Sequence, residues 1–340
     1  MLCRDADACY WIGRYVERAE ATARMVDVHY HAALDSGMSY NVEDVPPGET
    51  EPPIHWASLL KISGSDEDFY ARYESETDRD IIQFFAFDLK NPHSILSTWN
   101  RARDNARSIR EQIASEMWES INIFYLELRE WNVDRVLEGS PHEFFERVKR
   151  SSHLFQGILN RTMLMSETRD WLDVGRFLER GDQTARLLDV KYHDLLPAYR
   201  AIEENAHPAV EPLGVGSQLD IHGWIAVLKS VSAFEMYRKV YPAGLRSASV
   251  VDFLVLNPQF PASVRHCVKR VDGCLTRIGD GPKESETAME PQRLIMRLMA
   301  DLQYVRPGSI IKSGLHEFLE DIQVQCADLG DSITKTYLSY

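Results

Sequence analysis

An internal duplication constrains the fold of this 340-residue chain more than any other feature of its sequence. Residues 13–34 (GRYVERAEATARMVDVHYHAAL) align without a gap on residues 175–196 (GRFLERGDQTARLLDVKYHDLL), and 12 of the 22 positions are identical. Weaker matches follow in the same order: 56–73 with 224–241, 84–95 with 252–264, and HEFFE (142–146) with HEFLE (316–320). The order of the matches predicts two tandem, pseudo-equivalent halves, about 1–162 and 163–340.

Apolar residues recur at helical spacing in most segments, and no long alternating run bounded by turn residues occurs. In the first repeated segment they are Ile12, Val16, Ala19, Ala23, Val26 and Tyr30. The fold class predicted is therefore all-α, a multi-helix bundle. The expected helices are about 5–36, 55–73, 78–88, 93–115, 117–137, 142–167, 170–196, 217–240, 247–256, 261–279, 287–305 and 312–338.

Charge and composition exclude several classes of protein. The formal net charge of -14 opposes binding to the phosphate backbone of a nucleic acid. No run approaches the roughly 18 apolar residues of a membrane span, and the N-terminal residues lack the order of a signal peptide. Five cysteines without a CxxC pair are typical of reduced thiols. We expect a cytoplasmic protein that binds neither nucleic acid nor membrane.

A polar stripe accompanies the apolar one in both copies of the repeated segment. Its residues are spaced 4, 3, 4, 3, 4, so they follow one line along a helix, next to the apolar face. The candidate site residues are the charged members of this stripe together with the arginines beside them: Arg14, Glu17, Arg18, Glu20, Arg24, Asp27 and His31 in the first half, and Arg176, Glu179, Arg180, Asp182, Arg186, Asp189 and His193 in the second.

Three interpretations of the stripe remain open. It could be a solvated face held by pairs such as Glu20–Arg24, each worth about 0.3–0.5 kcal/mol. A solvated face should drift after duplication, whereas these charges match between the copies at least as well as the apolar residues do. That favours either a buried network that sets helix register or a ligand site, in which arginines grip a carboxylate or phosphate and acids orient the guanidinium groups.

Other chemistry has weaker support. Neither copy has the Glu-x-x-His motif of di-metal bundles, and arginines lie between the carboxylates that could ligate a cation. We therefore expect no metal and no cofactor of the chain's own. No GxSxG motif occurs, and the GVGS segment (214–217) lacks the lysine of a phosphate-binding loop, so no catalytic residue is assigned.

The segment 99–122 of the first half is unusually polar, and its counterpart in the second half lacks most of these groups. A site retained in one copy only would give this asymmetry, but so would a surface helix rich in charged pairs, which we favour. The second-tier candidates are Arg103, Asn105, Arg107, Glu116 and Glu119.

The segments GRYVERAEATAR, GRFLERGDQTAR, RDNARSIREQIASEMWE and RSSHLFQGI resemble the alpha-E family, also known as domain of unknown function 403. The likeness covers nearly the whole chain and implies one alpha-E domain over 1–340. On the family's Glu-Arg motif, Glu17-Arg18 and Glu179-Arg180 are the matching positions. The resemblance also implies partners: a circularly permuted ATP-grasp ligase and a transglutaminase-like protein, in systems that make or modify peptides.

The leading hypothesis is an accessory component of such a ligase that binds a peptide or small anionic ligand. Arg14, Arg18, Arg176 and Arg180 would bind the anionic group, and Glu17 and Glu179 would orient them or hold an amine. The alternatives are an interaction scaffold without a ligand site, and a stand-alone enzyme acting on a small anionic or metal-dependent substrate.

Overall fold

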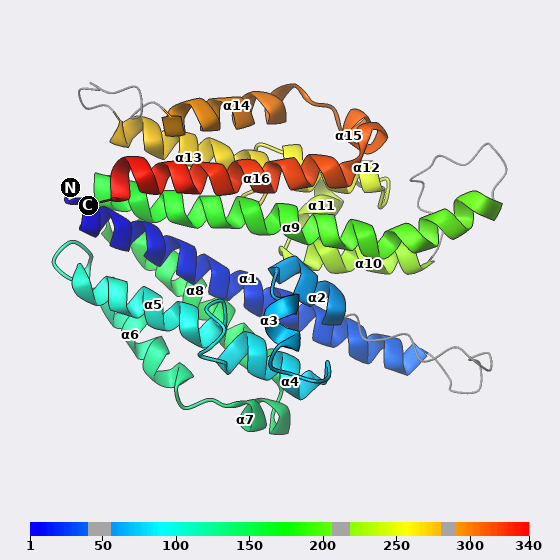
Figure 1. The fold of residues 1–340 in the computed structure, drawn as a ribbon, viewed down its shortest axis with the longest axis horizontal. Helices are drawn as coiled ribbons and strands as arrows, with labels where there is room; N and C mark the ends of the chain where they lie inside the picture. Colours follow the sequence, from blue (N-terminus) through cyan, green and yellow to red (C-terminus); the bar gives the residue numbers. More distant parts are fainter. Residues whose placement is uncertain (40–55, 206–217, 280–289, 340) are drawn as a thin grey trace.

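The computed structural model describes residues 1–39, 56–205, 218–279 and 290–339, with side chains except at 32–39, 58, 62, 190–205, 218–222 and 312. These residues form sixteen α-helices and three π-helical turns, and none of them lies in a strand. The all-α prediction is confirmed (Figure 1).

The helices fall into two series of eight, and each series starts with a long helix. The first series is α1 (Cys3–Ser39), α2 (Trp56–Ser63), α3 (Asp66–Tyr70), α4 (Asp78–Ile82) with η2 (Gln83–Phe87), α5 (Ile95–Ser108), α6 (Ser115–Leu128), α7 (Val133–Glu138) and α8 (Pro141–Thr162). The second is α9 (Glu167–Asn205), α10 (Gln218–Ser230), α11 (Phe234–Val240), α12 (Ser247–Val251) with η3 (Asp252–Leu256), α13 (Val264–Ile278), α14 (Glu290–Tyr304), α15 (Pro307–Ser313) and α16 (Leu315–Ile333) with η5 (Thr334–Leu338).

Several helices expected to be continuous are broken. The expected helix 55–73 divides at Gly64, whose φ of 60° lies in the left-handed region. The expected helix 217–240 divides at the corresponding place, where Ser232 has a φ of 51°. Gly314, with a φ of 113°, separates α15 from α16 within the expected helix 312–338, and most of α15 precedes that range. The expected helix 117–137 divides into α6 and α7, and the expected helix 93–115 ends at Ser108.

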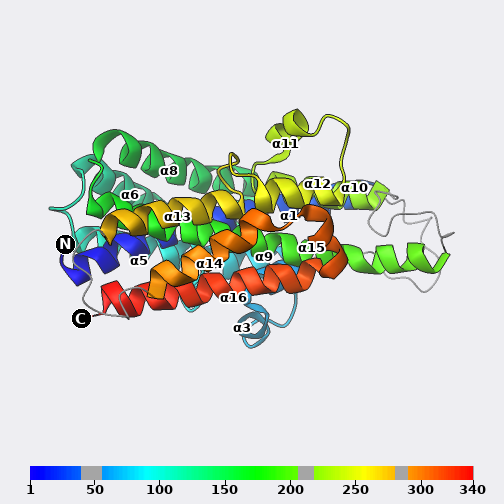
Figure 2. The same cartoon turned by 90° about the horizontal axis from the view of Figure 1, so that it is seen from above.

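The two long helices α1 and α9 run in the same direction side by side and diverge toward their C-terminal ends (Figures 1 and 2). Helices α5 and α8 pack on α1, while α13 and α16 pack on α9. Each half is therefore a bundle around its own long helix. The core between the helices includes the fully buried Trp56, Trp99, Trp171 and Trp224.

Two glycines set the distance between α1 and α9. A Cβ atom on Gly13 would lie 2.2 Å from the carbonyl oxygen of Leu172, and one on Gly175 would lie 1.9 Å from that of Tyr10. Both separations are far below van der Waals contact. The helices approach this closely because neither residue carries a side chain.

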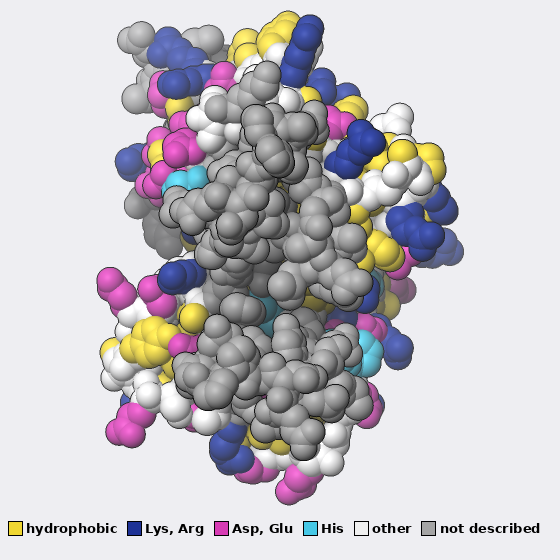
Figure 3. Space-filling model, turned by 90° about the vertical axis from the view of Figure 1, so that its right-hand side faces the viewer, with side chains coloured by type: hydrophobic (Ala, Val, Ile, Leu, Met, Phe, Trp, Pro, Cys, Tyr) yellow, Lys and Arg dark blue, Asp and Glu magenta, His cyan; other side chains and the backbone are white. Residues whose placement is uncertain are grey.

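No helix among the described residues has the length and apolar character needed to cross a membrane. The end of the molecule viewed in Figure 3 shows Lys and Arg side chains lying beside Asp and Glu side chains around its rim. Basic residues are thus mixed with acidic ones on the described part of this face.

We predict that Gly13→Ala and Gly175→Ala each lower the free energy of unfolding by about 3 kcal/mol, the upper end of the usual cost of overpacking. The added methyl group meets rigid backbone on the facing helix, so the helices must separate. Gly157→Ala on α8 is the matched control, because a Cβ there meets no atom within 4 Å. It should raise stability by about 0.5–1 kcal/mol in the same denaturant titration. Equal stability of all three variants would contradict the proposed role of the crossing.

Candidate functional site

The Glu-Arg positions of the two long helices pair with each other across the crossing. Glu179, fully buried, accepts hydrogen bonds from Nε of Arg14 (2.7 Å) and from Nε and Nη2 of Arg18 (2.6 and 2.8 Å). In the reciprocal pair, Arg180 donates from Nε and Nη2 to both oxygens of Glu17 (2.6 and 2.7 Å). We call these five residues the Glu-Arg clasp. The two carboxylates are buried, the three arginine side chains keep 15–16% exposure, and two of these arginines bind in bidentate geometry, so the clasp is not a solvated face.

The clasp is asymmetric because Arg176, the counterpart of Arg14, does not bind a glutamate of the facing helix. Arg14 is held toward Glu179 by a hydrogen bond to the hydroxyl of Tyr10 (2.7 Å). At the position corresponding to Tyr10 the second half has Leu172, which offers no acceptor. Arg176 instead donates to Asp173 (2.7 Å), one turn earlier on the same helix. Glu179 therefore has two arginine partners and Glu17 has one.

The two glutamates consequently titrate in opposite directions. Burial acts to raise the pKa of Glu179, but Arg18 and Arg14 outweigh it and hold that pKa well below its usual range. Burial raises the pKa of Glu17, since Arg180 alone does not compensate for it and the neighbouring Glu20 repels the second negative charge.

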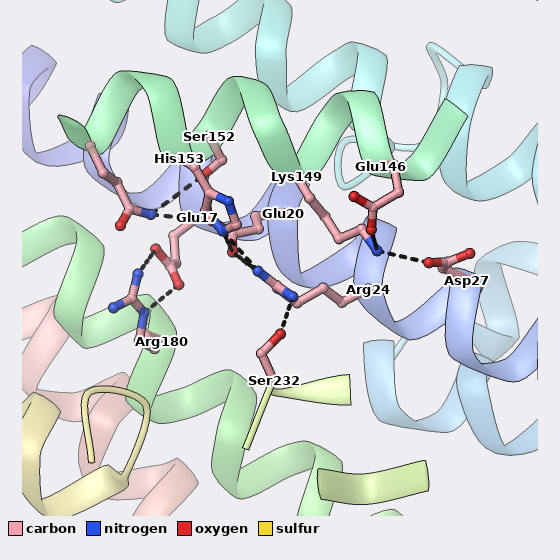
Figure 4. A network of polar contacts seen from close by, with 11 residues as sticks. Glu17, Glu20, Arg24, Asp27, Glu146, Lys149, Ser152, His153, Arg180 and Ser232 are labelled. Atoms are coloured by element: carbon pink, nitrogen blue, oxygen red, sulfur yellow. Dashed lines mark hydrogen bonds and ion pairs between the residues drawn. The ribbon is translucent and has the colours of Figure 1, made fainter. Parts of the chain in front are cut away.

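A cavity of about 240 Å³ opens beside the Glu17–Arg180 pair, between α1, α8, α9 and the segments that follow α10 and η3. We call it the Glu17 cavity. Its polar lining includes Glu17, Glu20, Arg24, His153, Gln156, Arg180, Gln183, Ser230 and Ser232, and its apolar lining includes Met25, Leu187, Val231, Phe260 and Pro261. Figure 4 shows polar side chains from α8 facing α1 and Arg180 of α9. Glu179, Arg14 and Arg18 do not line it.

The loop after η3 explains why the cavity lies on this side. In both halves an Asn-Pro sequence leads to a serine that caps the next helix: Ser94 accepts from the backbone N–H of Ser97, and Ser263 from that of His266. The second loop is three residues longer, and Phe260–Ala262 form part of the cavity wall. In the shorter loop, His93 contacts Nη1 of Arg18 at 3.0 Å.

Glu20 anchors the α8 side of the cavity. Its Oε1 accepts from Nε and Nη2 of Arg24 (3.0 and 2.6 Å), and its Oε2 accepts from the Ser152 hydroxyl (2.5 Å) and from Gln156 (3.2 Å). Although burial acts to raise the pKa of Glu20, these donors together with His153 hold it well below its usual range. Two carboxylates of one cavity thus have pKa values shifted apart.

The corresponding acid of the second half lacks these partners. Asp182 accepts from Nε of Arg186 (2.8 Å), but its other oxygen is buried without a hydrogen-bond partner among the described residues. Burial raises the pKa of this carboxyl. On α16, Cys326 and Gly330 stand at the positions of Ser152 and Gln156.

The last members of each stripe contact the final helix of their own half. Asp27 accepts from Lys149 (2.8 Å) and lies 2.9 Å from Nδ1 of His142, while His31 is 3.6 Å away. Asp189 lies 2.7 Å from Nδ1 of His316. The side chain of His193 lies outside the described residues.

The second-tier candidates do not reach the cavity. Arg107, Glu116 and Glu119 are exposed on α5 and α6, and Asn105 is partly exposed. Arg103 donates to Asn122 (2.7 Å) and lies over the ring of Tyr125. These contacts are those of a surface helix pair.

Several residues that the sequence did not single out complete the site, namely Ser152, His153 and Gln156 from α8, Gln183 from α9 and Ser232 after α10. Nη1 of Arg24 donates to the hydroxyl of Ser232 (2.5 Å). Nη2 of Arg24 lies 2.9 Å from Nε2 of His153. A signal for the α8 residues exists, because they fall within RSSHLFQGI. Nothing in the local sequence around Ser232 indicates its contact with a helix 208 positions earlier.

Comparison with known proteins gives one family and no solved structure. A family model described as a predicted alpha-helical domain with a conserved ER motif matches residues 1–338. Uncharacterized proteins from Mycobacterium bovis and Mycobacterium tuberculosis are each 24% identical over 361 residues, an alignment that covers 97% of this chain and 36% of theirs. The chain thus spans about a third of the length of these curated relatives. No solved structure matches it.

The opposite pKa shifts of Glu179 and Glu17 predict that the stabilities of Glu179→Gln and Glu17→Gln, relative to wild type, change in different ways with pH. Glu179→Gln should lower the free energy of unfolding at pH 7 by about 3–5 kcal/mol, because two arginines lose their buried partner. A depressed pKa stabilises the fold above the unfolded value of about 4.3, so this difference from wild type should shrink as the pH falls below about 4.3.

Glu17→Gln should cost less at pH 7, and its stability relative to wild type should improve as the pH rises above about 4.3, since it removes a carboxyl whose raised pKa penalises ionisation. Denaturant titrations between pH 3 and pH 8 measure both variants. Parallel pH profiles would contradict the assigned asymmetry.

Proposed function

The chain belongs to the alpha-E family, and we propose that it binds a small ligand bearing an amine or amide and a carboxylate, such as the end of a peptide, as an accessory component of an ATP-grasp ligase system. The observation that carries this proposal is the Glu17 cavity, which brings two Glu-Arg pairs together in one concave, partly apolar space. At about 240 Å³ it suits one terminal residue better than a large cofactor.

The cavity offers complementary groups to both ends of such a ligand. Arg180 uses Nε and Nη2 for Glu17, and the described residues give its Nη1 no hydrogen-bond partner. Oε1 of Gln183 is buried and likewise without a partner among them. An incoming carboxylate would accept from the guanidinium, and an N–H group would donate to the amide oxygen. Apolar residues such as Leu187 and Phe260 would cover the ligand's carbon atoms.

The proposed partner is a circularly permuted ATP-grasp protein, with a transglutaminase-like protein in the same system. Amide-bond formation by an ATP-grasp ligase consumes a carboxylate and an amine, the two groups that the cavity is suited to hold. The curated relatives are nearly three times as long as the matched region, so in them this unit shares a chain with other sequence.

We further propose that the two series of helices are copies of one unit. Three observations support it: the breaks after α2 and α10, the serine caps of α5 and α13, and the reciprocal close approach of Gly13 to Leu172 and of Gly175 to Tyr10. On this proposal one copy of the polar stripe lines a ligand cavity, and the other serves mainly in packing.

A purely structural scaffold is the second candidate. The half of the clasp formed by Arg14, Arg18 and Glu179 favours it, because all three side chains are committed to one another and none lines the cavity. Such a scaffold would still bind the ligase, but no cavity substitution would change the product without also breaking the complex.

The test uses Gln183→Leu, which preserves volume and removes both the unpaired amide oxygen and the amide N–H that donates to Glu179 at 3.1 Å. Gln325→Leu on α16, whose glutamine bonds Asp321 outside the cavity, is the matched control. Both variants should fold and co-purify with the proposed partner, a circularly permuted ATP-grasp protein. We expect Gln183→Leu to lower ATP-dependent product formation at least tenfold and Gln325→Leu to leave it unchanged, as measured by mass spectrometry.

Unchanged product with Gln183→Leu would remove the ligand-binding proposal and favour the scaffold. Failure of the wild-type chain to form a complex with the ligase would overturn the partner assignment instead. The two failures are therefore distinguishable.

A further inference from the structure

Three metal-binding side chains meet near the C-terminal end of the polar stripe, outside the Glu17 cavity. Asp27 and His31 are one turn apart on α1, and His142 approaches from the start of α8. One donor atom from each lies within 4.8 Å of the other two. Asp27 is buried, whereas the imidazoles of His31 and His142 are half exposed, so solvent reaches the group.

Two of the three donor separations are close to those around a bound ion. Oδ1 of Asp27 lies 2.9 Å from Nδ1 of His142 and 3.6 Å from Nε2 of His31. Adjacent ligands of an ion with bonds of about 2.1 Å are about 3.0–3.4 Å apart. One carboxylate and two imidazoles are a donor set used by zinc and by other divalent ions of the first transition row, and it leaves further coordination positions open.

The surrounding charges permit a cation. The sequence predicts no metal, because arginines lie between the carboxylates of the stripe. In the structure Arg14 and Arg18 are committed to Glu179, and Arg24 to Glu20. The cation next to Asp27 is Lys149, which binds the other carboxylate oxygen, Oδ2, at 2.8 Å.

Lys149 does not block the donor oxygen. Its ammonium is also paired with Glu146 at 2.5 Å, so Asp27, Lys149 and Glu146 together carry one net negative charge. A ligating carboxylate is commonly held by a hydrogen bond to its second oxygen, and Lys149 supplies such a bond.

The open groove beside His142 adds no net charge to this field, because its two further acids and two bases balance. It measures about 470 Å³, and its lining includes Glu127, Glu143 and Glu146 together with Arg147 and Arg150. The groove gives an ion and its water ligands a route from solvent to the imidazole.

A second observation is independent of this geometry. The same residues recur in the other half of the sequence as Asp189, His193 and His316, within the matching segments DVKYH and HEFLE. Asp189 lies 2.7 Å from His316, and at the position of Lys149 stands the neutral Gln323, which donates to Asp189 at 3.1 Å. The set of one carboxylate and two histidines thus occurs twice, although the residues around it differ.

We propose that Asp27, His31 and His142 bind a divalent ion of the first transition row through one carboxylate oxygen and two neutral imidazoles. Binding requires Nδ1 of His142, which faces Asp27, to give up its proton and the ring to carry its proton on Nε2. The bound ion would link α1 to α8 and keep open positions for water or an anionic ligand.

The experiment titrates Zn²⁺, in competition with a chromophoric chelator, into the untagged full-length chain after its treatment with EDTA. Wild type should bind Zn²⁺. His31→Ala and His142→Ala should each raise the dissociation constant of one Zn²⁺ equivalent at least tenfold. His266→Ala, on α13 and bonded to the backbone of Pro258, is the matched control and should bind as wild type does. Because both ligand histidines are half exposed, circular dichroism in EDTA should give the same melting temperature for all variants.

If Asp189, His193 and His316 also bind Zn²⁺, the double variant His31→Ala/His142→Ala should retain additional equivalents of the ion. Wild type that takes up no Zn²⁺, or a double variant that matches wild type in stoichiometry and affinity, would overturn the proposal. Neither result depends on the ligase assay, so the metal-site proposal and the ligand-cavity proposal are tested independently.

Discussion

The close crossing of α1 and α9 at Gly13 and Gly175 is the constraint on which the rest of the structure depends. Because each glycine contacts the backbone of the facing helix, residues one turn later come within reach of one another. The Glu-Arg clasp forms at that point. Its charges are costly to bury singly, and reciprocal bidentate pairing satisfies them while it sets the relative register of the two long helices.

Small differences between the halves turn one side of this crossing into a cavity. Tyr10 directs Arg14 to Glu179, and Gly330 leaves room for that guanidinium, since a Cβ there would lie 3.3 Å from its Nη1. On the other side Arg176 turns away to Asp173, so Glu17 keeps a single arginine partner. The longer loop after η3 then forms part of the wall of the Glu17 cavity.

The helices were largely predictable, because apolar periodicity is a local property of the chain. Two of the errors lie at Gly64 and Ser232, where a left-handed residue divides a helix whose apolar pattern continues through the break. The position of α15 was missed for a related reason: Gly314 ends one short helix and starts another within a few residues.

The sequence by itself determined the all-helical class, the repeated Glu-Arg stripe and its placement beside the apolar face, since these follow from residue spacing on one helix. Only the tertiary structure decided which charges pair. Glu17 meets an arginine 163 positions away, and the cavity draws Ser232 from a segment 208 positions beyond Arg24. Such contacts depend on how helices cross and how long the loops are, which residue spacing within one helix does not encode.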